Sequence, residues 1–159
     1  MLAPRKTLHS TPEAALREAF DMAQITQNDV LYDLGCGDGR CVVYAAKKFG
    51  IRCVGVEIDP ERAHEAQKLV EHEKVSHLVS IVCGNALDVD IQEATIVFLF
   101  LIDRGLRLIL PRLQQVPRTL RVITYLYRFQ GISPVEKRFC SLDPESDAAF
   151  PVYLYHIAV

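Results

Sequence analysis

The residues best suited to chemistry form a glycine-rich segment, D-L-G-C-G-D-G at residues 33–39, between an apolar stretch and a helical pattern. Glycines in such a turn let the backbone approach a ligand where a Cβ would collide. A helix that starts directly after the loop offers free N–H groups and the positive end of its dipole, which suit a carboxylate. Asp33 precedes the glycines, so it could pair with a ligand ammonium group or organise the loop amides.

Two further polar residues follow neighbouring predicted strands. Glu57 ends the second predicted strand, where a carboxylate can accept hydrogen bonds from both hydroxyls of a ribose. Ile58, beside it, could cover one face of an adenine ring. Asn85 lies in a Gly-Asn-Ala segment after the third predicted strand, and its amide offers one acceptor and two donors to an adenine edge. Because ligands of open α/β sheets bind at the carboxyl ends of the strands, this pattern predicts one nucleoside site.

A nicotinamide dinucleotide is the alternative ligand for a glycine loop. Its fingerprint is G-x-G-x-x-G, in which the third glycine permits close helix packing near the pyrophosphate. Here Gly39 follows Gly37 after one residue, and Arg40 occupies the position of the third glycine of that fingerprint. Asp33 would also face a negatively charged pyrophosphate. S-adenosylmethionine has no phosphate and carries a sulfonium and an ammonium group, so the loop favours it.

Strand and helix patterns alternate along the chain, which predicts a parallel sheet with helices on both faces. Seven strands are predicted, at residues 30–34, 51–57, 78–83, 94–101, 120–127, 135–142 and 152–159. Four helices are predicted, from an N-cap at Thr11 with Pro12 as first helical residue to residue 23, at 40–49, from Asp59-Pro60 with a buried stripe of Ala63, Ala66 and Val70, and at 104–113. Only residues 130–134 separate the fifth strand from the sixth, which leaves no room for a crossover helix. We therefore expect that pair to be antiparallel or rearranged.

The predicted fold class is α/β, a single doubly wound, mostly parallel seven-stranded sheet with a shortened C-terminal part. The length of 159 residues favours one domain. Within it we expect an N-terminal helical segment (1–29), a cofactor-binding half (30–103) and an acceptor-side half (104–159).

Composition narrows the function classes. Half of the residues are hydrophobic, and a formal net charge of -2 argues against a general polyanion binder and against disorder. The five cysteines form no C-x-x-C pair and the histidines are scattered, so we expect reduced thiols and no metal site. No targeting signal is apparent and the longest apolar run is too short to span a bilayer, so the expected location is cytoplasmic, without a membrane partner.

These motifs resemble the class I (seven-β-strand, Rossmann-like) methyltransferases. The chain is most similar to a small group related to mitochondrial protein-lysine N-methyltransferases outside the SET fold. The shared features are a Thr-Pro near the start, a D-L-G-x-G-D-G-R loop, a G-V-E-I-D second strand and an A-T-I-V-x-L-x-L-L fourth strand, here at Thr11-Pro12 and residues 33–40, 55–59 and 94–102. The resemblance covers residues 10 to 125, and it implies S-adenosylmethionine as cofactor.

The resemblance also implies roles for particular residues. The methionine part of the cofactor would contact the loop residues Asp33, Gly35, Cys36, Gly37, Asp38 and Gly39. The ribose would contact Glu57, and the adenine would contact Ile58, Asn85 and Ala86, although many relatives have Asp at the position of Asn85. The turn of Thr11 and Pro12 would close over the cofactor from one side.

The acceptor side is less defined, and no catalytic residue is assigned. Methyl transfer is a direct displacement that needs alignment of the nucleophile and exclusion of water, so a strong base is not required. Phe100, Tyr125 and Tyr127 follow central strands and could hold a lysine stem or the sulfonium by cation–π attraction, and Phe100 is also a cofactor-contact candidate. Asp103 could orient an acceptor. Ordinary core packing for the aromatic residues, and helix capping for Asp103, are the alternatives.

The absence of certain motifs narrows the range of possible acceptors. No N-P-P-Y-like loop follows the fourth predicted strand, which disfavours methylation of nucleobase or glutamine amino groups. Six arginines and no acidic residue lie between residues 104 and 128, a pattern that could mark a surface for an acidic protein or for nucleic acid, or simply solvated helix and strand ends. Because the stretch does not form a basic patch interleaved with aromatic residues, a nucleic-acid partner is disfavoured. An amine acceptor is expected, with a protein lysine ahead of a small molecule. A cofactor-binding but catalytically silent partner subunit is the alternative.

Overall fold

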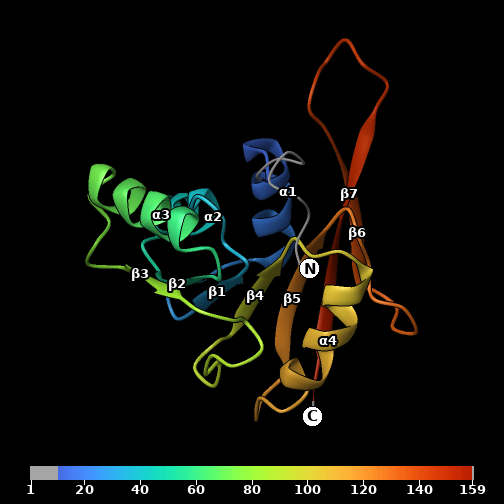
Figure 1. Cartoon of the computed structure of the whole chain (residues 1–159). Helices are drawn as coiled ribbons and strands as arrows, with labels where there is room; N and C mark the ends of the chain where they lie inside the picture. Colours follow the sequence, from blue (N-terminus) through green and yellow to red (C-terminus); the bar gives the residue numbers. More distant parts are fainter. Residues whose placement is uncertain (1–10, 159) are drawn as a thin grey trace.

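A seven-stranded sheet in the order β3-β2-β1-β4-β5-β7-β6 forms the centre of the molecule in the computed structural model, which describes residues 11–158 (Figure 1). The strands are β1 (Val30–Leu34), β2 (Arg52–Glu57), β3 (Val79–Cys83), β4 (Ile96–Leu99), β5 (Leu120–Tyr125), β6 (Glu136–Ser141) and β7 (Ala149–Ile157). The pairs among β1 to β5 are parallel, and β7 is antiparallel to both β5 and β6. The expected α/β fold with a doubly wound, mostly parallel sheet is confirmed.

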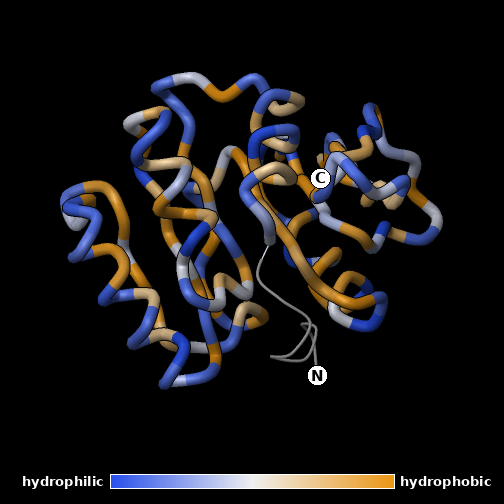
Figure 2. Tube along the Cα trace, turned by 90° about the horizontal axis from the view of Figure 1, so that it is seen from above, coloured by the Kyte–Doolittle hydropathy of each residue, from blue (hydrophilic) through white to orange (hydrophobic). Residues whose placement is uncertain are grey.

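Helices cover both faces of this sheet. The helices are α1 (Glu13–Ala23), α2 (Arg40–Phe49), α3 (Pro60–His72) and α4 (Asp103–Leu113). Buried side chains of α1, α2 and α3 join one apolar core on one face of the sheet. Those of α4 and of the segment between β3 and β4 join a second core on the other face. In Figure 2, hydrophobic colour is concentrated in the central strands and hydrophilic colour at the periphery.

Local sequence signals explain where the helices near the loop begin and end. Asp59 caps α3 by accepting a hydrogen bond from the amide of Glu61, and Pro60 supplies the preset φ of the first helical residue. The predicted buried stripe of Ala63, Ala66 and Val70 is confirmed. Helix α2 has the predicted bounds and ends at Gly50, whose φ of 66° places it in the left-handed region.

The β6–β7 hairpin rises beyond the carboxyl edge of the parallel strands (Figure 1). The last residue of β5, Tyr125, pairs with Val152, whereas β7 continues to pair with β6 as far as the Ser141–Ala149 pair. Three further residue pairs, about 10 Å of ladder, therefore lie beyond the end of β5. The tip of this hairpin therefore lies beyond the edge of the sheet at which ligands of open α/β sheets bind.

The structure decides between the two alternatives for the fifth and sixth strands, and it corrects the bounds of two strands. The fifth and sixth strands are not an antiparallel pair, because β7 lies between them; the rearranged alternative is the correct one. Strand β5 ends at Tyr125 and not at residue 127, since Leu126 has a positive φ of 68° and leaves the ladder. Strand β7 begins at Ala149, earlier than predicted, because it pairs with all of β6. The last residue of the predicted strand, Val159, lies outside the described residues.

Two predicted element starts are also wrong. Pro12 and not Thr11 occupies the N-cap of α1, because a ψ of 153° makes Pro12 extended and excludes it from the helix. Strand β4 begins at Ile96, because the Thr95 hydroxyl bonds to Asp29 and to the backbone of Val30.

Candidate functional site

The glycine loop at residues 35–39 is held to the end of β2 by backbone hydrogen bonds. The amides of Gly35 and Cys36 both donate to the carbonyl oxygen of Val56, at 2.8 and 2.9 Å. The amide of Gly39 donates to the carbonyl oxygen of Cys36 and closes the turn before α2. This network fixes the loop at the carboxyl edge of the sheet, between the ends of β1 and β2.

Glu57, the last residue of β2, contacts the glycine loop through its side chain. Its side chain is 6% exposed. One carboxylate oxygen, Oε1, accepts a hydrogen bond from the amide of Gly37 at 2.9 Å, and the other, Oε2, accepts one from the amide of Asp59, also at 2.9 Å. Each carboxylate oxygen has two lone pairs, so acceptor capacity remains for ligand hydroxyls.

Asp33 is the second buried carboxyl group of the site. It is 3% exposed, and its side chain is hydrogen-bonded to the thiol of Cys41 in the first turn of α2. Burial raises the pKa of Asp33 to about 7; the hydrogen bond with Cys41 opposes this shift, and the charges of Glu57 and Asp38 add to it. Asp33 is therefore a carboxyl group that a nearby positive charge would return to its ionised form.

The loop glycines have conformations that other residues rarely adopt. Gly35, Gly37 and Gly39 have φ values of 102°, 57° and 86°. A Cβ on Gly39 would lie 3.0 Å from the Cβ and 3.2 Å from the Cα of Ala66 in α3, so this glycine permits close packing of loop and helix. A Cβ on Gly37 would lie 2.6 Å from a guanidinium nitrogen of Arg62.

The charges at the loop fit a cationic ligand better than a phosphate. Asp33 and Glu57 are buried, and each raises the pKa of the Cys36 thiol, after burial itself. The backbone at Gly35 to Gly39 offers a surface without side chains. The sulfonium and ammonium groups of S-adenosylmethionine would be attracted by these carboxylates, whereas the pyrophosphate of a dinucleotide would be repelled.

The predicted adenine contacts lie at the ends of β2 and β3. Ile58 is 64% exposed, an unusual position for a large apolar side chain, and it directly follows Glu57. The side-chain oxygen of Asn85 accepts a hydrogen bond from the amide of Leu87 at 2.9 Å, so it organises its own turn and leaves the NH2 group to donate. Ala86 packs partly buried against the second core.

The structure separates the acceptor-side aromatic residues. Phe100 and Tyr125, at the ends of β4 and β5, form an edge-to-face pair with ring centroids 5.1 Å apart. Tyr127 joins the core on the opposite face of the sheet, because the positive φ of Leu126 interrupts the alternation of the strand. Burial raises the pKa of Tyr125 to about 12, so its hydroxyl is neutral near pH 7.

The remaining predicted residues lie near the starts of α1, α2 and α4. Asp103 is exposed in the first turn of α4, where it favours the helix dipole but makes no side-chain capping bond. The Asp38 carboxylate accepts hydrogen bonds from the backbone and the guanidinium of Arg40. Thr11 is buried and, with Pro12, precedes α1, which leads to the opposite end of β1.

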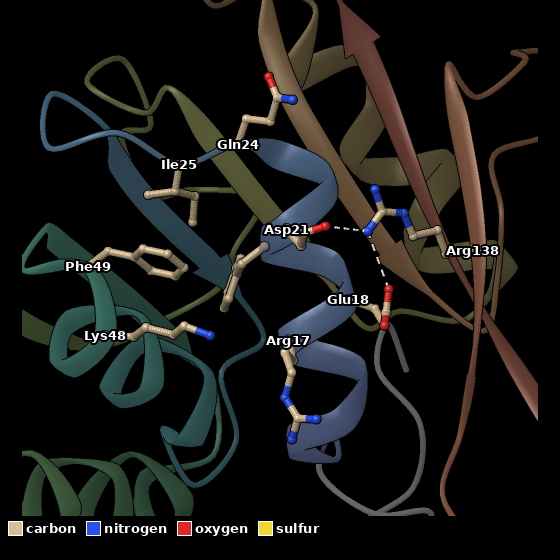
Figure 3. A pocket seen from close by; sticks show the side chains of 9 residues that line it. Arg17, Glu18, Asp21, Gln24, Ile25, Lys48, Phe49 and Arg138 are labelled. Carbon is tan, nitrogen blue, oxygen red and sulfur yellow. Dashed lines mark hydrogen bonds and ion pairs between the residues drawn. The ribbon is translucent and has the colours of Figure 1, made fainter.

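A cavity of about 510 Å³ between α1, α2 and α3 is lined in part by Asp38 of the glycine loop. A groove of about 590 Å³ lies between α1, the end of α2 and Arg138 of β6 (Figure 3). Arg138 is neutralised there by Glu18 and Asp21. Within residues 11–158, no group of three or more His, Cys, Asp or Glu side chains is placed to hold a metal ion. In the same part of the chain no helix is long and apolar enough to cross a membrane.

Two residues near the loop, Cys41 and Arg62, and the packing role of Gly55 escaped sequence reasoning. Cys41 bonds to Asp33, Arg62 lies against Gly37, and Gly55 makes room for Cys36, whose Sγ would lie 2.9 Å from a Cβ at position 55. Cys41 and Arg62 each lie in the first turn of a helix that begins beside the loop. Their position in the first turn is the signal in the sequence that points to these two residues.

Comparisons with known proteins agree with this geometry. The family described as the ANTKMT methyltransferase domain matches residues 33–136. A protein-lysine N-methyltransferase of Saccharolobus islandicus is 42% identical over 129 residues, which cover 79% of this chain and 80% of that protein.

Solved structures give the same picture. An RNA methyltransferase from Salinibacter ruber in complex with S-adenosyl-L-homocysteine is 32% identical, with a TM-score of 0.84 and 94% of each chain covered. A geranyl diphosphate C-methyltransferase from Streptomyces coelicolor has a TM-score of 0.61 over 70% of this chain and 42% of its own. At 23% identity that second likeness concerns the fold alone.

Proposed function

This chain belongs to the ANTKMT methyltransferase domain family and is an S-adenosylmethionine-dependent methyltransferase, and we propose that the acceptor of its methyl group is the side-chain amine of a protein lysine. The observation that carries the proposal is the 42% identity to a protein-lysine N-methyltransferase over most of both chains. The acceptor edge is consistent with it, because it presents an aromatic pair and no N-P-P-Y-like loop.

The proposed cofactor contacts follow the order of strands along the edge. Asn85, Ile58 and Glu57 end β3 and β2 and would hold the adenosine, whereas Asp33 and the glycine loop end β1 and would hold the methionine part. In its ionised form, Asp33 would pair with the ligand ammonium group. We assign Cys36, Asp38 and Ala86 to the lining of this site, and Thr11 with Pro12 to its rim.

The reaction requires little acid–base chemistry from the chain. Bound S-adenosylmethionine supplies a methyl group on a positively charged sulfur. The chain must hold a neutral amine in line with that methyl group and exclude water. The faces of Phe100 and Tyr125 are suited to the apolar lysine stem or to the sulfonium, an attraction worth about 0.5–2 kcal/mol. Asp103, from the exposed start of α4, could orient the acceptor.

The order of the proposed contacts along the edge assigns different roles to two parts of the chain. We assign residues 30–103 to the cofactor and residues 104–159 to the acceptor, within one domain. A small-molecule amine is the second candidate acceptor, since direct displacement places no demand on the size of the nucleophile. We keep the cytoplasm as the proposed location, because all five cysteines are free thiols, as expected in a reducing compartment.

The acceptor is tested by incubating the protein with isotope-labelled S-adenosylmethionine and a cell extract, followed by mass spectrometry of proteins, RNA and metabolites. The proposal expects label on lysine side chains of proteins. Label that is confined to RNA or to small molecules would contradict it. Tight cofactor binding with no labelled product would support a silent subunit instead.

A further inference from the structure

The six arginines between residues 104 and 128 fall into two groups by their partners. Arg112, Arg118 and Arg121 donate to backbone carbonyl groups, and Arg121 also pairs with Asp29. The first two connect α4 and the segment after it to the segment between β3 and β4, and Arg121 connects β5 to the end of α1. In contrast, Arg104, Arg107 and Arg128 are exposed, and across residues 11–158 no side chain or carbonyl group forms a hydrogen bond or ion pair with them.

The three unpaired arginines surround the acceptor end of the sheet. Arg104 lies in the first turn of α4, which begins four residues after β4 ends, and Arg107 lies one turn further on. Arg128 follows the end of β5 by three residues. Because β4 and β5 are parallel neighbours, Arg104 and Arg128 both lie at the carboxyl edge, on the side of β1 that is opposite to Glu57.

Acidic residues lie beyond this edge, on the β6–β7 hairpin. The tip of the β6–β7 hairpin, which projects beyond the carboxyl edge (Figure 1), carries Asp143, Glu145 and Asp147, all exposed. The acceptor end of the sheet therefore has three exposed arginines, one of them beside Asp103, along α4 and after β5, and negative charge on the hairpin.

We infer that Arg104, Arg107 and Arg128 form a recognition surface for acidic residues that accompany the target lysine in the acceptor protein. This inference rests on the proposed protein-lysine acceptor. A segment of mixed charge suits both sides of the edge, since its carboxylates would meet the arginines while its lysine reaches the pair of Phe100 and Tyr125, at the strand that borders the hairpin. RNA does so poorly, because its phosphates would approach Asp143, Glu145 and Asp147.

Peptides of one length test the charge preference, with a central lysine flanked by glutamate, by glutamine or by arginine. The charge preference found with the peptides is compared with the residues that flank the lysines methylated in extract proteins. An exposed ion pair contributes modestly, so three together correspond to about a tenfold difference in kcat/KM. We expect the glutamate-flanked lysine to be favoured over the glutamine-flanked lysine by about tenfold, and the preference to shrink as salt rises.

Two triple variants locate the preference. The first carries Arg104→Gln, Arg107→Gln and Arg128→Gln. The matched control carries Arg17→Gln, Lys68→Gln and Lys74→Gln, which remove the same three charges from exposed positions on α1 and at the end of α3. The affinity for S-adenosyl-L-homocysteine, measured by calorimetry, should be unchanged in both. The first variant should lose the glutamate preference, and the control should retain it.

The outcomes separate this inference from the proposed function. Methylation of lysine regardless of the flanking charge, or a preference that survives in the first triple variant, would overturn the inference while the lysine acceptor stands. Modification of RNA with no modified lysine in peptides or extract proteins would contradict both.

Discussion

The Glu57 carboxylate accepts a hydrogen bond from the amide of Gly37, 2.9 Å away, and so ties the end of β2 to the middle of the glycine loop. Gly37 has a positive φ of 57°, and the Glu57 carboxylate also accepts a hydrogen bond from the amide of Asp59 at the start of α3. The proposed ribose-binding residue is therefore positioned by the loop and the helix that would surround the ligand. A side chain held in this way loses little freedom when a ligand binds.

The free energy of unfolding should depend on the ionisation of Asp33. The pKa of Asp33 is about 7 in the folded protein, against 3.8 for an unperturbed carboxyl, so the folded state holds the proton more tightly. Asp33 therefore contributes stability below pH 4 that is lost as the pH rises toward 7, by up to about 1.4 kcal/mol per pH unit. Urea unfolding of the protein and of Asp33→Asn between pH 4 and 8 measures this. The difference between the two should change steadily from pH 4 to about 7 and level off above it; a constant difference would contradict the shift.

Cofactor affinity should respond to pH in the opposite direction. Only ionised Asp33 attracts an ammonium group, so affinity for S-adenosyl-L-homocysteine should rise by about tenfold from pH 6 to pH 8. Asp33→Asn should bind weakly with a flat profile. Calorimetric titration at several pH values gives both. An identical pH profile in the variant would remove Asp33 from the site.

Gly39→Ala should cost more stability than an alanine in an open turn. Both Gly39 and Gly131 have a positive φ, 86° and 79°, which costs any other residue about 1–2 kcal/mol. A Cβ at Gly39 meets Ala66, but a Cβ at Gly131 has no atom within 4 Å. Overpacking should add about 1–3 kcal/mol at Gly39 alone. Urea unfolding of the two variants measures the difference, and equal losses would mean that the loop does not pack tightly on α3.

The Asp29–Arg121 pair should stabilise the fold far more than a surface pair does. The Asp29 side chain is 5% exposed and also accepts hydrogen bonds from Thr95 and from the amide of Thr26. Arg121→Met leaves a buried carboxylate without its cation, with an expected cost of about 3–5 kcal/mol. Arg52→Met breaks the exposed pair with Glu93 and should cost no more than about 1 kcal/mol. Similar losses of unfolding free energy in the two variants would refute this ranking.

Much of the fold follows from local signals. The bounds of β1 and α2 could be predicted because an apolar run, a glycine loop and a C-terminal glycine mark their ends. The position of β7 between β5 and β6 could not, because strand order within a sheet depends on long-range pairing. The early end of β5 depends on the positive φ of Leu126, a residue type that gives no sign of that conformation.

The candidate site was predictable in its residues but not in its internal bonds. Spacing alone places Asp33, Glu57 and Asn85 at the ends of neighbouring strands, and the structure brings these strand ends to one edge. The bond between Cys41 and Asp33 and the contact of Cys36 with Gly55 depend on three-dimensional packing. The different surroundings of Tyr125 and Tyr127 depend on the turn at Leu126, so alternation along the strand misplaces Tyr127. Which of these residues touch the ligand stays a prediction.

The most direct test compares S-adenosyl-L-homocysteine with its 2′-deoxy analogue on the protein and on Glu57→Ala. A hydrogen bond to a charged group contributes about 1.5–3 kcal/mol, so the intact protein should bind the deoxy analogue about 10- to 100-fold more weakly. In Glu57→Ala the two ligands should bind almost equally, because the variant has lost the acceptor of the hydroxyl. The same ratio of affinities in both proteins would contradict the central claim that the carboxylate at the end of β2 holds the ribose.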